Sequence, residues 1–317
     1  MLILYLLCLI LGFIILVYGA DFLVDGSSAL AKRMNMPVII IALTIVAFGT
    51  SAPELVVNVI AAINGKDQLP LANVLGSNIF NILGALGATA IVCPFVVKKT
   101  SRRIDVPMAI FAALLVLIFA LDNAFNFSEG LVLLLCFLLF MTYTVVLTLH
   151  RKGKKSADEE IEIHNYSFVK CLLFTFLGFA GLIIGGKMLV EGAVYVAAAV
   201  GISERIIGLT IVSIGTSLPE LVTSLVAARK GNSDIAIGNI VGSNIINTFL
   251  ILGCSVVICP INVREDSVVD LFLNLGASVL VLLFIYGGRR RRITKLEGYL
   301  LVLTYLAYMS YLVWQTI

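Results

Sequence analysis

Long apolar runs separated by short polar segments make up most of the sequence. A helix needs roughly 20 apolar residues to cross about 30 Å of hydrocarbon, and each run meets that length. The pattern predicts ten membrane spans, over residues 2–24, 37–63, 70–95, 104–122, 128–149, 167–190, 203–228, 234–259, 268–287 and 296–316. We therefore expect an all-α polytopic membrane protein with ten transmembrane helices.

The loops differ in their content of basic residues. One alternating set carries 17 lysines and arginines: Lys32, Arg33, Lys98, Lys99, Arg102, Arg103, Arg151, Lys152, Lys154, Lys155, Arg229, Lys230, Arg289, Arg290, Arg291, Arg292 and Lys295. The other set carries three, Lys66, Arg205 and Arg264. Because basic loops stay in the cytoplasm, this distribution predicts that both termini lie on the extracytoplasmic side.

The two halves of the chain resemble each other at a constant offset of 166 residues. Over residues 37–94, 26 of 58 positions are identical in the second half without a gap. Each half holds five spans, an odd number, so the second must enter the membrane upside down. We predict two inverted five-helix repeats, 1–149 with its motif at 44–87 and 167–317 with its motif at 210–253, joined by a cytoplasmic linker at 150–166. Inverted repeats are typical of secondary transporters.

Composition removes several classes of protein. The chain is 60% hydrophobic and 13% charged, with a mean hydropathy of +1.08, whereas soluble domains carry about 25% charged residues. Six cysteines form no CxxC pair and there are only two histidines, which argues against zinc or iron–sulfur sites. Because no nucleophile–base pair is visible either, we expect no enzyme, no cofactor and no nucleic-acid partner.

The most polar part of each repeat lies within an apolar run. It reads Ala47-Phe-Gly-Thr-Ser-Ala-Pro-Glu54 in the first half and Ser213-Ile-Gly-Thr-Ser-Leu-Pro-Glu220 in the second. Pro53 and Pro219 interrupt a helix and free backbone carbonyls, and we expect Gly49 to tolerate the bent backbone. An intramembrane glutamate without a basic neighbour indicates a functional site.

A second polar group recurs further along each half. Ser77 and Asn81 are four residues apart and face the same way on a helix, as do Ser243 and Asn247. Together with the glutamates they offer only hard oxygen donors, which suit Na⁺, Ca²⁺ or Mg²⁺. For Asn78 and Asn244, a role in interhelical hydrogen bonding is the alternative to ion binding. Asp25 and Glu191 lie at span ends, where an interfacial position is expected.

The paired GTS-x-PE and GSNI-x-N motifs resemble the two α-repeats of the cation/calcium exchanger superfamily, specifically its sodium/calcium exchangers. The resemblance covers nearly the whole chain. It implies ion binding between the repeat-bearing spans, by Glu54, Asn81, Glu220 and Asn247. Flanking positions implied in the same way are the hydroxyls of Thr50, Ser51, Ser77, Thr216, Ser217 and Ser243 and the backbone carbonyls of Ala47 and Ser213. Some relatives carry Asp where this chain has Asn247.

These observations predict a sodium/calcium antiporter of a prokaryotic inner or plasma membrane, working by alternating access as an electrogenic calcium exporter. Its substrates would be Ca²⁺ and Na⁺, its surroundings the lipid bilayer, and no obligate protein partner is implied. Two alternatives remain at this point. A buried carboxylate could carry H⁺ instead of binding Na⁺, and a passive cation channel would use similar carboxylates and carbonyls.

Overall fold

The computed structural model describes residues 2–151, 164–199, 201, 213–264, 267–287 and 291–316. Helices account for almost all of it. The elements of the first half are α1 (Leu2–Arg33), α2 (Val38–Ile41), η1 (Ala42–Val46), α3 (Ala47–Thr50), α4 (Ala52–Ile63), α5 (Gln68–Ile79), η2 (Phe80–Leu86), α6 (Gly87–Val92), β1 (Phe95–Val96), η3 (Ser101–Asp105), α7 (Val106–Phe119), η4 (Ala120–Asp122), β2 (Ala124–Phe125) and α8 (Phe127–Arg151).

The second half follows the same order where it is described. Its elements are α9 (Phe168–Ala199), α11 (Ser213–Thr216), α12 (Leu218–Arg229), α13 (Ser233–Ile246), η6 (Asn247–Leu252), α14 (Gly253–Ile258), β3 (Ile261–Asn262), α15 (Ser267–Gly287), β4 (Arg292–Ile293) and α16 (Lys295–Thr316). The segments η1, η2, η3 and η6 are π-helical turns, a geometry often found at functional sites.

Nine of the predicted spans have a counterpart in the described part of the chain. Eight helices are long and apolar enough to cross a membrane, and a ninth candidate is the pair Val38–Thr50 and Ala52–Ile63, bent by 48°. The predicted span 203–228 is described only from residue 213, and residues 152–163 of the predicted linker also lie outside the described residues. The molecule is thus a polytopic helical membrane protein, and the count of ten remains a prediction.

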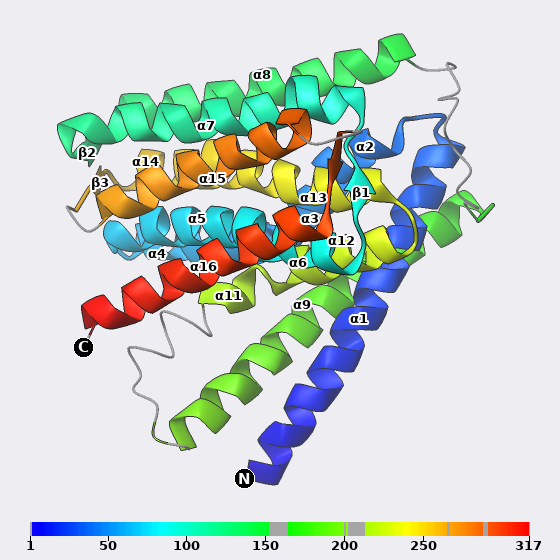
Figure 1. Cartoon of the computed structure of the whole chain (residues 1–317), viewed down its shortest axis with the longest axis horizontal. Coiled ribbons are helices and arrows are strands. Elements are labelled where there is room, and N and C mark those ends of the chain that lie inside the picture. The colour runs from blue at the N-terminus through cyan, green and yellow to red at the C-terminus, as the bar shows by residue number, and fades with distance from the viewer. Residues whose placement is uncertain are drawn as a thin grey trace.

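Helices α1 and α9 lie side by side and cross the other helices obliquely (Figure 1). Glycines bring their backbones into contact: a Cβ on Gly19 would lie 2.7 Å from the backbone N of Leu182, and one on Gly185 would lie 2.5 Å from that of Leu16. Each helix is 32 residues long, so both extend nine residues past their predicted ends at 24 and 190. The sequence pattern missed these ends because the added turns are less apolar, and α1 buries Ser27 and Ser28 against protein.

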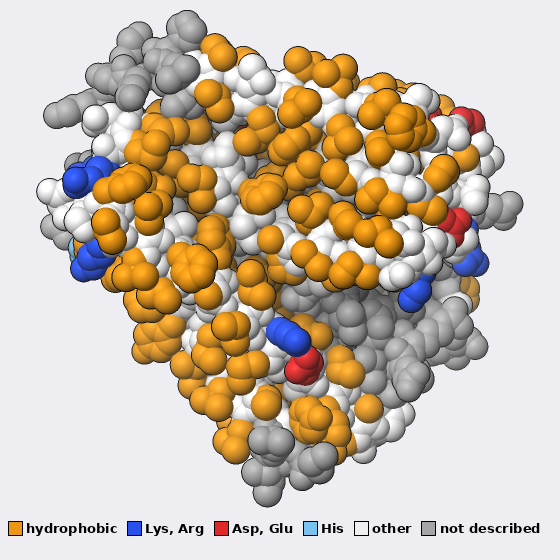
Figure 2. Space-filling model, turned by 180° about the vertical axis from the view of Figure 1, so that it is seen from behind, with side chains coloured by type: hydrophobic (Ala, Val, Ile, Leu, Met, Phe, Trp, Pro, Cys, Tyr) orange, Lys and Arg blue, Asp and Glu red, His pale blue; other side chains and the backbone are white. Residues whose placement is uncertain are grey.

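Apolar side chains cover most of the face shown in Figure 2, and charged side chains are few. Large apolar residues on several helices are well exposed, among them Phe13, Leu138, Leu303 and Trp314. The polar residues of the repeats lie inside instead. The segments Gln68–Val92 and Ser233–Ile258 are each 83% buried over their most apolar stretch, whereas the outer helix Lys295–Gln315 is 17% buried. Apolar side chains outside and polar side chains inside are the arrangement expected of a protein surrounded by lipid.

Candidate cation site

Both glutamates follow a break in a helix. Ser51 leaves helical geometry between α3 and α4 (φ −84°, ψ 4°), and Ser217 does so between α11 and α12 (φ −95°, ψ 7°). Pro53 and Pro219 occupy the first turn of the following helix, where the missing N–H would have no partner anyway. Each break therefore places a glutamate at a helix N-terminus, where the helix dipole favours a negative charge.

The glycines at the breaks serve packing more than backbone geometry. Neither Gly49 nor Gly215 is among the described residues with positive φ. A Cβ on Gly49 would lie 2.0 Å from the ring of Phe179, and one on Gly215 would lie 2.2 Å from Cγ2 of Val190. Both neighbours belong to α9, so this one helix covers both breaks. The expectation that Gly49 accommodates a bent backbone is thereby corrected.

The two carboxylates are bound across the halves. Ser217 donates its hydroxyl to Oε1 of Glu54 at 3.2 Å, and Ser51 donates to Oε1 of Glu220 at 3.0 Å. Ser243 also donates to Oε1 of Glu220, at 3.2 Å. Glu54 is 1% exposed and Glu220 is fully buried. Among the described residues no lysine or arginine forms an ion pair with either glutamate.

Several buried oxygens of the predicted site find no hydrogen-bond partner within the described residues. They are Oε2 of Glu54, Oε2 of Glu220, Oδ1 of Asn81, Oδ1 of Asn247 and Oγ of Ser77. An unpartnered buried polar atom costs about 1–3 kcal/mol, and more if it is charged. Four of these five atoms can only accept, so a bound cation is the partner that satisfies them best.

Three of the four remaining predicted positions, Thr50, Ala47 and Thr216, have partners within the protein. Thr50 donates towards the backbone oxygen of Ala47 at 3.2 Å and Oδ1 of Asn239 at 3.0 Å. The carbonyl of Ala47 also accepts from the backbone N of Ser51. Thr216 lies against Glu54. Ser213 begins α11, and the described contacts say nothing of its carbonyl.

Sequence reasoning did not select several polar residues that surround the glutamates. Asn58 donates to the backbone oxygen of Glu54 at 2.7 Å, and Asn239 donates to the backbone oxygen of Glu220 at 3.2 Å and to Ser224 at 3.1 Å. A signal was available, because Asn58 and Ser224 each follow a glutamate by four residues and so share its helix face. Asn78 and Asn244 form interhelical hydrogen bonds, the role that was given as the alternative to ion binding.

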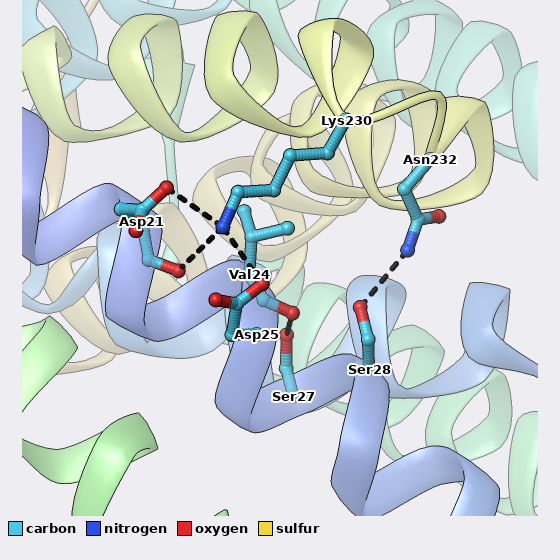
Figure 3. Close-up of polar contacts among 7 residues, drawn as sticks. All are labelled: Asp21, Val24, Asp25, Ser27, Ser28, Lys230 and Asn232. Atoms are coloured by element: carbon cyan, nitrogen blue, oxygen red, sulfur yellow. Dashed lines mark hydrogen bonds and ion pairs between the residues drawn. The ribbon is translucent and has the colours of Figure 1, made fainter. Parts of the chain in front are cut away.

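A second pair of acidic side chains, Asp21 and Asp25, lies on the C-terminal half of α1 and forms ion pairs with one lysine. Lys230 Nζ is 2.7 Å from Oδ1 of Asp21 and 2.7 Å from Oδ1 of Asp25, and it donates to the backbone oxygen of Asp21 at 3.3 Å (Figure 3). Next to it, Asn232 donates to Ser28 at 2.9 Å. Burial lowers the pKa of Lys230, but the hydrogen bonds and charges of the two aspartates outweigh it, so the net pKa is raised. Asp25, for which an interfacial position was expected, is thus ion-paired with Lys230.

These features define a polytopic helical membrane protein in which two broken helices share one buried polar centre. A family model described as sodium/calcium exchanger protein matches residues 4–146 and 170–314. The chain belongs to the sodium/calcium exchanger family, whose members are transporters and not catalytic enzymes, and it is a cation/Ca²⁺ exchanger of the prokaryotic type.

Individual relatives match over almost their full length. The putative antiporter CaxA of Alkalimonas amylolytica is 36% identical over 310 residues, covering 94% of this chain and 95% of CaxA. The sodium/calcium exchanger MaX1 of Methanosarcina acetivorans is 33% identical, covering 96% and 97%. A solved structure of the sodium–calcium exchanger NCX_Mj, soaked with Na⁺ and Ca²⁺, matches with a TM-score of 0.84 at 29% identity, covering 98% and 99%.

Proposed function

We propose that this chain is a secondary antiporter that exchanges Na⁺ for Ca²⁺ at one site between its two halves. The observation that carries the proposal is the set of unpartnered acceptor oxygens on Glu54, Glu220, Asn81 and Asn247. Backbone and hydroxyl oxygens of the breaks can complete the six to eight ligands that Ca²⁺ prefers. The site carries two formal negative charges, which one Ca²⁺ balances.

Alternating access by two inverted repeats, residues 1–149 and 167–317, is the mechanism that fits this arrangement. The strands β1 and β3 begin at equivalent positions, Phe95 and Ile261, yet β1 pairs with β4 and β3 pairs with β2. These two strand pairs lie at opposite ends of the helix bundle (Figure 1). Equivalent segments at opposite ends support an inversion of one half relative to the other, and hence ten spans.

Orientation and energetics follow from charge. The excess of basic residues at alternate loops supports an orientation with both termini outside, and the membrane that we propose is a prokaryotic inner or plasma membrane. If three Na⁺ enter for each Ca²⁺ that leaves, as the family resemblance suggests, one net charge moves per cycle. That charge is worth about 2.3 kcal/mol per 100 mV, so the membrane potential would help drive Ca²⁺ export.

The test is ⁴⁵Ca²⁺ uptake into proteoliposomes loaded with Na⁺. We expect uptake that requires an outward Na⁺ gradient. Because three Na⁺ would leave for each Ca²⁺ that enters, uptake should increase when K⁺ and valinomycin clamp the vesicle interior positive and decrease when they clamp it negative. Uptake driven by a pH gradient without Na⁺ would favour proton coupling. Ca²⁺ movement that needs no counter-ion would favour a channel, and uptake indifferent to the clamped potential would reject electrogenic exchange.

A further inference from the structure

The two ends of the helix bundle share a set of equivalent polar contacts. At the inner end, which the basic loops predict to be cytoplasmic, Lys98 lies 3.0 Å from Asp234. The positions equivalent to these at the outer end are Arg264 and Gln68, and Arg264 donates to Gln68 at 3.0 Å. The strand pairs β1–β4 and β2–β3 likewise lie one at each end (Figure 1). The segments that carry these contacts are therefore bonded in the same way at both ends.

Helices α4 and α12 also end in the same turn. The residues that follow them, Asn64 and Lys230, have φ/ψ of −82°/8° and −78°/5°. The next residues, Gly65 and Gly231, have positive φ of 68° and 76°, a region that glycine enters readily. We call residues 64–66 the outer turn and residues 230–232 the inner turn. Because the two backbones agree, Asn64 occupies the place on the outer turn that Lys230 occupies on the inner turn.

Helix α1 docks on the inner turn. Lys230 forms ion pairs of 2.7 Å with Asp21 and with Asp25, and Asn232 donates to Ser28 at 2.9 Å (Figure 3). An ammonium group has only donors, and the two carboxylates of α1 offer only acceptors. The inner turn and α1 are therefore complementary both in charge and in hydrogen bonding.

Helix α9 carries the surface that is equivalent to the aspartate surface of α1. The equivalent residues are Lys187 and Glu191, whose charged groups lie 3.8 Å apart and whose side chains are 75% and 61% exposed. Asn64 and Lys66 of the outer turn are exposed as well. Among the described residues, no hydrogen bond or ion pair links α9 to the outer turn. The two ends thus differ in how α1 and α9 contact them.

The outer turn has the chemistry to bind the charged pair of α9. Lys187 offers donors and Glu191 offers acceptors, and the amide of Asn64 has an acceptor oxygen and a donor nitrogen. Asn64 can therefore accept from Lys187 and donate to Glu191 at once. A lysine at this position, as on the inner turn, would instead repel Lys187. Each turn is matched to a different helix surface, the inner turn to two carboxylates and the outer turn to a lysine–glutamate pair.

We infer that the outer turn is the docking surface for Lys187 and Glu191 of α9, and that this contact replaces the contact between the inner turn and α1. The two contacts exclude each other because α1 and α9 are packed backbone to backbone and shift as one unit. A Cβ on Gly19, for example, would lie only 2.7 Å from the backbone N of Leu182. The inference rests on the proposed function, since it names the residues that hold each of two alternating arrangements.

Deuterium uptake, measured by mass spectrometry on the purified full-length protein without Ca²⁺ or Na⁺, reads both turns in one experiment. Lys230→Met removes the inner contact. We expect uptake over residues 227–233 to become faster and uptake over residues 61–67 to become slower, each by about two- to fivefold, the range that partly exposed ion pairs support. A protein that is only destabilised takes up deuterium faster at both ends. Uptake over residues 61–67 that is unchanged or faster would therefore overturn the inference.

Two further variants show whether Lys187 causes the slower uptake. Lys230→Met combined with Lys187→Met should lose the protection of the outer turn, because the amide of Asn64 then has no ammonium group to bind. Lys98→Met is the matched control: it removes another ion-paired lysine of the inner end, but the equivalent contact already exists at the outer end. Uptake over residues 61–67 should not change in this variant. Protection that persists without Lys187, or that also appears in Lys98→Met, contradicts the assigned contact. Glu191→Gln keeps an acceptor oxygen and should leave the contact intact.

A transplanted contact tests the outer turn without any change at Lys230. Asn64→Lys combined with Lys187→Asp copies the inner arrangement, one lysine facing two carboxylates, onto the outer end, where Glu191 supplies the second carboxylate. Uptake over residues 61–67 should become slower in this double variant. Asn64→Lys alone should not slow it, because two lysines then face each other. Equal uptake in the single and double variants would show that α9 does not reach the outer turn.

These measurements need no transport, so the docking surface and the proposed function can fail separately. If the wild-type protein shows no Na⁺-dependent ⁴⁵Ca²⁺ uptake while Lys230→Met changes the two turns in opposite directions, the proposed function fails and the docking surface stands. If the wild-type protein exchanges the two ions but Lys230→Met does not protect the outer turn, the docking surface fails alone.

Discussion

The molecule contains two pairs of carboxylates that contact both halves, and they are treated in opposite ways. Asp21 and Asp25 share Lys230, whose side chain is 30% exposed, and the aspartates are 42% and 20% exposed. Glu54 and Glu220 are at most 1% exposed and accept hydrogen bonds from the hydroxyls of Ser217, Ser51 and Ser243. The exposed pair carries its counter-charge in the protein, whereas the buried pair has none among the described side chains.

The difference separates a structural ion pair, at Asp21 and Asp25, from the candidate cation site at Glu54 and Glu220. A buried charge without a partner costs several kcal/mol, so a pair of them persists only if something compensates for it. Lys230 cannot leave, so the aspartate pair can only link α1 to the end of α12. In the proposed function, the glutamate pair is instead compensated by a cation from solution, which can be exchanged.

The largest effect is expected from neutralising either buried carboxylate. Glu54→Gln or Glu220→Gln should reduce Na⁺-dependent ⁴⁵Ca²⁺ uptake about a hundred- to a thousandfold. The reason is that one unit charge at about 4 Å contributes about 4 kcal/mol at an effective dielectric constant of 20. Uptake is measured in proteoliposomes of matched protein content. Glu191→Gln is the control, because this glutamate is 61% exposed and paired with Lys187. Retention of more than a tenth of wild-type uptake by Glu54→Gln would contradict the assigned role.

The second effect concerns stability with and without Ca²⁺. A ligand at a hundred times its Kd stabilises the folded state by about 2.7 kcal/mol, so Ca²⁺ should raise the melting temperature of the wild-type protein. The double variant Glu54→Gln with Glu220→Gln should lose this response, and Asp21→Asn with Asp25→Asn should keep it. Differential scanning fluorimetry in detergent measures both. If Ca²⁺ no longer raises the melting temperature of the aspartate variant but still raises that of the glutamate variant, the aspartates and not the glutamates bind Ca²⁺.

Much of the fold could be predicted because lipid selects long apolar runs. Nine predicted spans have counterparts, and the break before Pro53 follows from the missing N–H of proline. The last two turns of α1 and α9 could not be predicted from hydropathy. In α1 those turns are buried by protein, and burial against protein tolerates Ser27 and Ser28, which lipid would not.

The site was predictable in its residue types and less so in its contacts. Repetition and intramembrane position singled out both glutamates, and the structure gathers Ser51, Ser217 and Ser243 around them. The pairing of Ser51 with Glu220 and of Ser217 with Glu54 could not be predicted, because both hydrogen bonds cross between the halves. The contacts of Asn239 and Thr248 were missed for the same reason. Spacing within one helix reports on shared faces and not on partners from another helix.

A smaller effect is expected from removing the lysine of the exposed pair. Lys230→Met leaves two aspartates without their cation and should destabilise the protein by about 1–2 kcal/mol, below the 3–5 kcal/mol of a fully buried pair because solvent screens these groups. Denaturant-induced unfolding measures the change. Adding Asp21→Asn and Asp25→Asn to Lys230→Met should recover part of the loss, because the uncompensated charges are gone. A triple variant less stable than Lys230→Met would show that the aspartates have stabilising partners other than the lysine.

The smallest expected effect is the pH dependence of the stability that the protein loses in Lys230→Met. The pKa of Lys230 lies above its ordinary value of 10.5 in the folded protein, so the folded state holds this proton more tightly than the unfolded chain does. Its contribution is therefore complete below pH 10.5 and is lost as the pH rises through the folded value. The gap in melting temperature between the wild-type protein and Lys230→Met should stay constant from about pH 7 to pH 9 and shrink only above the ordinary lysine value. If the gap closes at low pH but does not shrink above pH 10.5, the stabilisation comes from hydrogen bonds of the aspartates and not from the charge on Lys230. The aspartate pair would then not be a pair whose charge is balanced within the protein, and the contrast with the glutamates would fail.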